Sequence, residues 1–174
     1  MNEIIKKAEK QKPTIQWKIG VADTTFARID MYQAVARAFA DAQQSDASLD
    51  IEVVRYTVPG IKDLPVACKS LLTNNKCDIA IALGMPGPMQ IDKQCSHEAS
   101  MGIQQAMLMT TKHILEVFVH YDEEKDPRKL VALAHDRAYK HARNAIALLK
   151  GPTTLTPFAG KGLRQGKQHV GSLE

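Results

Sequence analysis

The sequence predicts an α/β fold built on a parallel sheet with helices on both faces. A short apolar run, a polar or Gly/Pro-containing loop and a stretch with helical spacing of apolar residues follow one another four times. Repeated β-α units of this kind favour a parallel sheet with covering helices. The third run, residues 77–84, is almost wholly apolar, as expected of a strand that is covered on both faces.

The first two β-α units have loops of six residues each. The first strand is predicted over 17–22 and its loop over 23–28, before a helix whose apolar face begins at Met31. The second strand is predicted over 50–57 because β-branched residues are frequent there. Its loop, 58–63, contains Pro and Gly and leads into the second helix.

Of the last two units, only the third has a longer loop. The third strand, 77–84, is followed by a predicted loop over 85–95, and Ser96 is a candidate cap for the third helix. The fourth strand is predicted over 114–120. A polar loop then leads to a long helix over 127–149, in which a proline stands at the first position.

Size and composition fit one globular domain of an intracellular protein. The 174 residues are 44% hydrophobic and 24% charged. A net charge of +4 with only 5% aromatic residues does not indicate nucleic-acid binding. Three cysteines without a CxxC pair argue against a disulfide framework or a zinc ribbon. Without a long apolar run or a signal-peptide core, we expect no membrane association and a cytoplasmic location.

The chain divides into three predicted segments. Residues 1–13 are rich in lysine and glutamate and are expected to form an N-terminal arm. Residues 14–150 form the predicted α/β domain, and residues 151–174 form a tail rich in Gly, Pro and basic residues.

Ligands of such sheets bind beyond the carboxyl ends of the strands, where the strand order reverses. In the first loop, Phe26 could stack on a planar ring or fold back onto the core. Val58, Pro59 and Gly60 offer backbone donors and acceptors at close approach. Asp63 is favoured as a cap of the following helix, and it could in addition accept hydrogen bonds from ligand hydroxyls.

Further candidates follow the third and fourth strands. The turn 84–87 is rich in Gly and Pro, so it is either a structural turn or a backbone surface for a ligand. His97 and Glu98 are expected to open the third helix, and His120 ends the fourth strand. Each of these residues could serve catalysis or have a purely structural role.

Two cationic-capable residues lie on the apolar stripe of the long helix. Arg137 and His141 are four residues apart and follow Leu130 with helical spacing. On a face turned toward protein they need a partner, which could be an anionic ligand, a carboxylate or a neighbouring subunit. The alternative is that this edge of the stripe is exposed to solvent.

Several familiar catalytic motifs are missing from the sequence. There is no GxGxxG after the first strand, no complete P-loop, no HExxH and no GxSxG. A longer set of motifs, in this order along residues 17–167, resembles archaeal-type riboflavin synthase. The motifs are 23–28 (DTTFAR), 57–68 (TVPGIKDLPVAC), 82–87 (ALGMPG), 95–100 (CSHEAS), 116–120 (EVFVH) and 159–166 (AGKGLRQG).

The resemblance implies a lumazine synthase-like fold, namely a flavodoxin-like three-layer α/β/α sandwich with a four-stranded parallel sheet. It implies a homopentamer with active sites between subunits. The implied reaction is a dismutation of two molecules of 6,7-dimethyl-8-ribityllumazine, which yields riboflavin and 5-amino-6-ribitylamino-uracil. No cofactor is required, although the resemblance leaves room for assistance by a divalent cation such as Mg²⁺, and no metal ligands are predicted.

The residues and the resemblance together predict the members of the site. Catalytic roles are expected for His97, Glu98 and His120. Substrate contacts are expected from Thr25, Phe26, Val58, Pro59, Gly60, Asp63, Gly84, Met85, Pro86, Gly87, Phe118, Arg137 and His141.

Two alternatives remain at this point. Lumazine synthases resemble the chain at Phe26, in the spacing from Gly60 to Pro65 and at Arg137. They carry a Thr-Thr-His in the third loop, where this chain has Met-Gln-Ile at 89–91, and a lysine where it has His141. These differences favour dismutation over lumazine formation. A non-catalytic lumazine- or flavin-binding pentamer is disfavoured because so many titratable residues are predicted around one site.

Overall fold

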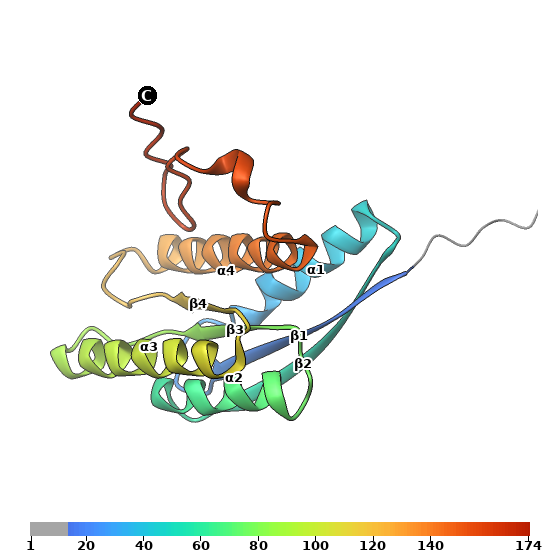
Figure 1. The fold of residues 1–174 in the computed structure, drawn as a ribbon. Coiled ribbons are helices and arrows are strands. Elements are labelled where there is room, and N and C mark those ends of the chain that lie inside the picture. The colour runs from blue at the N-terminus through green and yellow to red at the C-terminus, as the bar shows by residue number, and fades with distance from the viewer. Residues whose placement is uncertain (1–13) are drawn as a thin grey trace, which may run out of the picture.

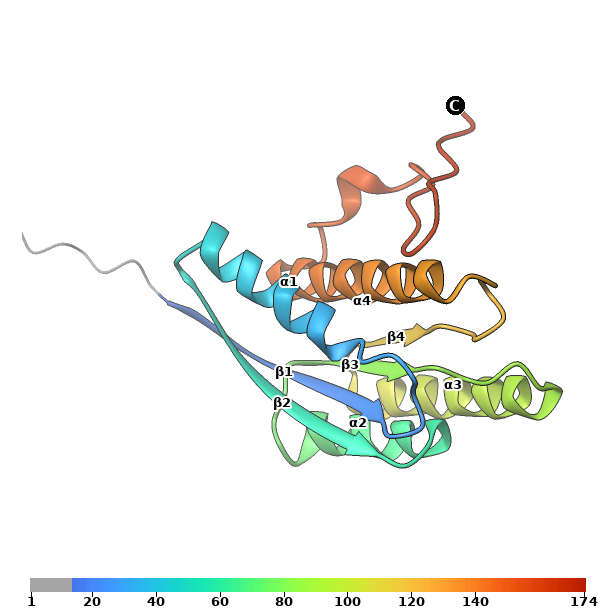
Figure 2. The same cartoon turned by 180° about the vertical axis from the view of Figure 1, so that it is seen from behind.

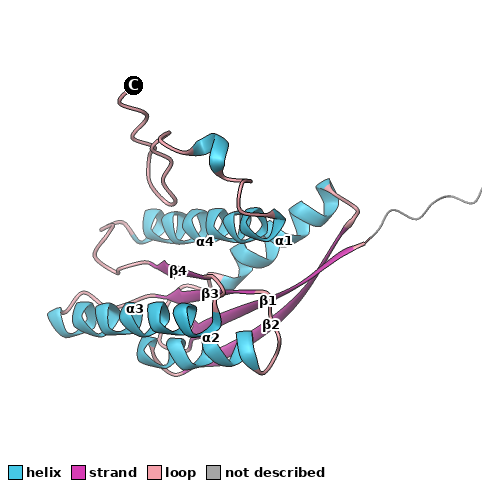
Figure 3. Cartoon of the chain, in the orientation of Figure 1, coloured by secondary structure: helices cyan, strands magenta, loops and turns pink. Residues whose placement is uncertain are grey.

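The computed structural model describes residues 14–174, so the predicted N-terminal arm, 1–13, lies outside the described residues. Strands and helices alternate from the start of the described chain to the end of the long helix (Figures 1 and 3). The elements are β1 (Ile15–Thr24), α1 (Tyr32–Ser45), β2 (Leu49–Val58), the 3₁₀ helix η1 (Ile61–Asp63), α2 (Leu64–Thr73), β3 (Ile79–Gly84), α3 (Gln90–Thr110), β4 (Ile114–Phe118), α4 (Pro127–Lys150) and the 3₁₀ helix η2 (Thr156–Phe158).

The four strands form one parallel sheet in the order β2-β1-β3-β4. Strands β1 and β2 pair over their full length, from Ile15 opposite Leu49 to Thr24 opposite Val58. The chain passes from β1 to one edge of the sheet and then returns to the other side of β1. The reversal of strand order therefore lies between β1 and β3, and the predicted parallel sheet is confirmed.

Helices cover both faces of the sheet and complete three layers (Figures 1 and 2). Helices α1 and α4 pack together on one face, and α2 and α3 pack together on the other. Along β1, Ile19 and Val21 belong to the core under α1 and α4, whereas Ala22 belongs to the core under α2 and α3. The period of two along a strand thus assigns alternate residues to opposite layers.

Small residues on one face of the sheet let helix α2 approach closely. Gly20, Ala80 and Ala82 lie on the α2 and α3 side of β1 and β3. A Cβ added at Gly20 would lie 2.9 Å from the Cβ of Leu71 in α2. The glycine is therefore required by the distance between strand and helix.

Helix α3 begins earlier than the sequence predicted. Met89 has an extended backbone, and its N–H donates to Asp92 Oδ2 at 3.1 Å, so the helix is capped there. Ser96 is buried within the helix rather than placed at its cap. The expectation that His97 and Glu98 open the helix is therefore wrong, because they lie about two turns inside it.

Helix α4 agrees with its prediction. It begins at Pro127, and the Asp126 side chain accepts from the N–H groups of Arg128 and Lys129. No helix within residues 14–174 is long and apolar enough to cross a membrane.

We expect the substitution Gly20→Ala to lower the free energy of unfolding by about 1–3 kcal/mol, because the added methyl group overpacks a rigid contact. The matched control is Gly60→Ala, where φ is −141° and the added Cβ would meet only Asp63 Oδ2 at 3.8 Å. Urea unfolding of both variants measures the difference. A Gly20→Ala variant as stable as the unsubstituted protein would contradict the packing argument.

Candidate functional site

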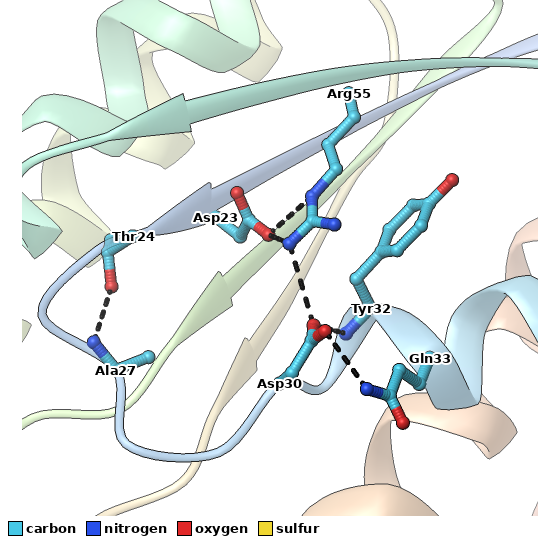
Figure 4. A network of polar contacts seen from close by, with 7 residues as sticks. All are labelled: Asp23, Thr24, Ala27, Asp30, Tyr32, Gln33 and Arg55. Atoms are coloured by element: carbon cyan, nitrogen blue, oxygen red, sulfur yellow. Dashed lines mark hydrogen bonds and ion pairs between the residues drawn. The ribbon is translucent and has the colours of Figure 1, made fainter.

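An ion-pair network holds the loop that follows β1 (Figure 4). Buried Asp23, near the end of β1, accepts from Arg55 of β2, with the Arg55 Nε at 2.8 Å. Arg55 also contacts Asp30 at 3.5 Å and lies over the ring of Tyr32, 4.2 Å from its centroid. The two ends of the loop are therefore tied to the same guanidinium group.

Phe26 lies at the outer part of this loop. Its side chain does not fold back onto the core, since the residue is 60% exposed. The loop is turned at this point by a hydrogen bond from the Ala27 N–H to Thr24 Oγ1 at 3.2 Å. The exposed ring is available for stacking, and that role stays a prediction.

The loop after β2 lies beside the loop after β1. The Thr25 N–H donates to the Val58 carbonyl at 2.9 Å, and Thr25 Oγ1 donates to the Pro59 carbonyl at 3.3 Å. Asp63 Oδ2 accepts from the Gly60 N–H at 3.1 Å, so Asp63 does cap the start of the helical segment. We call these residues, together with Phe26, the first cluster.

The turn after β3 is hydrogen-bonded to the segment after β4. The Gly84 carbonyl accepts from the Val119 N–H at 3.0 Å, and the Pro86 carbonyl accepts from the Tyr121 N–H at 3.1 Å. A Cβ at Gly84 would lie 2.6 Å from the ring of Phe118, so glycine allows the ring to contact the backbone. The side chain of Met85 is buried in the core rather than presented at the surface.

A polar basin of about 590 Å³ lies at the other edge of the sheet, beside β4. Five predicted site residues line it, and six further residues join them. The lining residues are Lys93, Ser96, His97, Ser100, Glu116, Phe118, His120, Glu123, Arg137, His141 and Lys167. We call this cavity the β4 basin.

Arg137 forms an ion pair with Glu123, a partner that the sequence did not predict. Two parallel bonds of 2.7 Å join the guanidinium group to the carboxylate, and Arg137 Nη1 also donates to the Phe118 carbonyl at 2.7 Å. Burial alone would raise the pKa of Glu123, but hydrogen bonds from Arg137 and from the His120 N–H lower that pKa to about 2. The acidic loop before α4 was the only sequence signal for this partner.

Burial shifts the pKa values of two other titratable side chains in the basin. Burial raises the pKa of Glu116, against a 2.9 Å hydrogen bond from Ser100 Oγ and the nearby His120. Burial and the charge of Arg137 lower the pKa of His141. The buried Nδ1 of His141 has no hydrogen-bond partner within residues 14–174.

Glu98 lies apart from the two histidines with which it was grouped. Its carboxylate pairs with Lys62 of η1 at 2.6 Å and accepts from Gln94 at 3.0 Å. Hydrogen bonds from Lys62 and Gln94 lower its pKa. Glu98 is therefore turned toward the segment after β2, whereas His97 and His120 line the β4 basin.

Eleven of the predicted site residues thus form two groups within one chain, whereas Glu98 and the turn 84–87 belong to neither. The first cluster stands at the ends of β1 and β2, and the β4 basin lies at the opposite edge of the sheet. Strands β2 and β4 are separated by β1 and β3, which corresponds to about 14 Å at the usual strand spacing. No three His, Cys, Asp or Glu side chains in the described part of the chain are grouped so that they could hold a metal ion.

Comparisons with known proteins cover most of the chain. The model of the family described as 6,7-dimethyl-8-ribityllumazine synthase matches residues 16–152. The chain is 54% identical over 156 residues to the riboflavin synthase of Methanothermobacter thermautotrophicus, which covers 90% of this chain and 99% of the relative. The riboflavin synthases of Archaeoglobus fulgidus and Aeropyrum pernix are 45% and 42% identical, over 90% of this chain and 98% and 97% of their own lengths.

We expect the ion pair of Glu123 to make stability depend on pH. The folded-state pKa of Glu123 lies at about 2, below its ordinary value of 4.5. Its contribution is therefore fully present above pH 4.5 and is lost as the pH falls toward 2. The substitution Glu123→Gln should cost roughly 2–3 kcal/mol at pH 7, because it leaves Arg137 largely buried without a counter-charge.

The difference between Glu123→Gln and the unsubstituted protein should shrink as the pH falls from 4.5 toward 2. Asp122→Asn is the matched control, because Asp122 forms an exposed pair with Lys93 at 2.6 Å. Such pairs contribute about 0–1 kcal/mol. Thermal unfolding between pH 2 and 7 measures both, and a pH-independent difference would contradict the assignment.

Proposed function

The chain belongs to the 6,7-dimethyl-8-ribityllumazine synthase family, and we propose that within this family it acts as a riboflavin synthase. The observation that carries the proposal is its near full-length similarity to archaeal proteins of that name. The reaction joins two molecules of 6,7-dimethyl-8-ribityllumazine, one of which donates a four-carbon unit to the other. The products are riboflavin and 5-amino-6-ribitylamino-uracil.

The pairing of Arg137 with Glu123 supports dismutation over lumazine formation. In lumazine synthases a sugar phosphate must be bound, and a free guanidinium group is well suited to that task. Here both terminal nitrogens of Arg137 are engaged by Glu123. The exposed Ile91 also stands where lumazine synthases carry a histidine, so the phosphate-handling groups are altered at two places.

The β4 basin supplies the groups for the proton transfers of the proposed reaction. A methyl group of one lumazine must lose a proton before its carbon can attack the second ring. His97 and His120 line the basin together with Glu116, whose raised pKa makes it a readier proton carrier than an exposed carboxylate. The catalytic role of Glu98 stays a prediction, because its carboxylate pairs with Lys62 in the single chain.

Positioning accounts for much of the rate in this proposal. Two flat rings held in register convert an encounter of two molecules into a reaction within one complex. The proposed reaction is internally balanced and needs no redox cofactor. Assistance by a divalent cation and a cytoplasmic location both stay predictions.

The separation of the two residue groups supports an assembly of several subunits. The first cluster of one subunit would meet the β4 basin of a neighbour, which reunites the residues predicted to share a site. Helix α3 offers an apolar surface for such contacts, since Leu108 is 83% exposed and Met101, seven residues earlier, is also exposed. We propose that this assembly is a homopentamer, the oligomeric state that the resemblance to archaeal-type riboflavin synthase implies.

The activity is tested by incubating the purified protein with 6,7-dimethyl-8-ribityllumazine alone. We expect riboflavin fluorescence to appear, with 5-amino-6-ribitylamino-uracil formed in equal amount. The comparison incubation contains 5-amino-6-ribitylamino-uracil and a four-carbon sugar phosphate. Lumazine formation in the second tube without riboflavin in the first would instead identify a lumazine synthase, and tight binding without turnover would identify a binding protein.

The assembly is tested by light scattering of the purified protein. We expect a mass near 96 kDa, five times the 19.2 kDa of one chain. A charge on the exposed face of α3, as in Leu108→Glu, should lower both the mass and the activity, whereas Lys69→Glu on α2 serves as the control for an exposed charge change. A monomer that retains full activity would rule out a site shared between subunits.

A further inference from the structure

The C-terminal tail returns to the body of the protein after α4. It passes through η2 and folds back over α4 on the side away from the sheet (Figures 1 and 2). Residues 162–170 form a closed loop, because the Val170 N–H donates to the Gly162 carbonyl at 3.0 Å. The Arg164 N–H donates to His169 Nδ1 across the same loop at 3.0 Å.

The tip of this loop is fixed against α4 and against the loop that precedes it. The Gly166 N–H donates to Asp136 Oδ2 at 3.1 Å. Gly166 has φ of +71°, and a Cβ there would lie 2.8 Å from Arg137 Nε, so both its conformation and its closeness to α4 favour glycine. The next residue, Lys167, reaches Glu123 Oε2 at 3.3 Å and lines the β4 basin.

The charges of the basin leave Lys167 without a carboxylate of its own. Lys93 pairs with Asp122 at 2.6 Å, and Arg137 takes both oxygens of Glu123 at 2.7 Å. Among the lining residues described here, Lys167 is thus the additional cation, held by a longer contact to an already paired carboxylate. Its side chain is 47% exposed, so the ammonium group has room to move toward a ligand.

We propose that Lys167 is a substrate-contacting residue that binds the lumazine in its ionised form. When the methyl C–H bond breaks, the proton passes to a base of the site and the electron pair stays on the ring system. The resulting negative charge is spread over the ring nitrogens and carbonyl oxygens. The ammonium group of Lys167 takes no part in the proton transfer and donates a hydrogen bond to this anion.

This role rests on the proposed riboflavin synthase activity and extends it to the tail. A compact ammonium group on a flexible stem suits a charge that appears during the reaction and disappears again. Since Arg137 is neutralised by Glu123, a second cation is needed if the basin is to stabilise an anion. The tail loop thereby becomes a wall of the site.

The test compares Lys167→Met with Lys167→Arg and with the control Lys161→Met, which changes an exposed lysine of the same tail outside the basin. Two rates are measured: riboflavin formation, and exchange of the acidic methyl protons of the lumazine in D₂O by proton NMR. We expect Lys167→Met to slow both about 10- to 100-fold, less than the loss of a fully buried oxyanion donor because Lys167 is half exposed. Lys167→Arg should retain most of both rates, and Lys161→Met should leave them unchanged.

Limited proteolysis of the tail separates a charge effect from a loss of docking. Gly166→Val strains the loop and clashes with Arg137, so we expect it to release the tail from α4. Its cleavage rate is the reference for an undocked tail. Lys167→Met should instead be cleaved as slowly as the unsubstituted protein. Methyl exchange at the unsubstituted rate in Lys167→Met, or a tail cleaved as fast as that of Gly166→Val, would overturn the role of Lys167. An unsubstituted protein that neither exchanges methyl protons nor forms riboflavin would overturn the proposed function itself.

Discussion

The paired Arg137 and Glu123 side chains join the parts of the molecule that surround the β4 basin. Arg137 extends from α4, Glu123 lies in the loop after β4, and the guanidinium group also holds the carbonyl of Phe118 at the end of that strand. Glu123 in turn accepts from the His120 N–H and contacts Lys167 of the tail. One largely buried ion pair therefore fixes a helix, a strand end and the C-terminal tail relative to one another. Such a pair supplies geometry more than net stability, because desolvation opposes the attraction of the charges.

Much of the fold follows from local patterns in the sequence. The near-continuous apolar run of β3 and the alternation along β1 are direct consequences of helices on both faces of a parallel sheet. The sequence prediction placed the start of α3 too late because it relied on the spacing of apolar residues. The actual start is marked instead by a hydrogen bond from the Met89 N–H to the Asp92 side chain, which such spacing does not reveal. The resemblance predicted site residues in several loops and helices, and their roles stay predictions. In the structure the first cluster and the β4 basin lie at different edges of the sheet.

The pairings inside the basin depended on tertiary structure. Glu123 and Arg137 are 14 residues apart, on a loop and a helix whose mutual approach is set by the packing of α4 on the sheet. Ser100 and Glu116 come together from α3 and β4 in the same way. The contact of Lys167 with Glu123 depends on the path of the tail, in which glycines with positive φ reverse the chain. No spacing rule applies to residues that meet through such turns, so sequence periodicity did not identify these partners.

The two carboxylates of the basin are driven in opposite directions by their surroundings. Glu123 faces two cations and a backbone N–H, which keep it ionised and make it a fixed anchor. Glu116 is half-buried with only a hydroxyl donor and a nearby imidazole, and burial raises its pKa. Environments that separate the pKa values of neighbouring groups are what acid and base chemistry at one pH requires. Because Glu123 also neutralises Arg137, the proposed stabilisation of a transient anion falls to Lys167. In this proposal the C-terminal tail takes part in the reaction through that side chain.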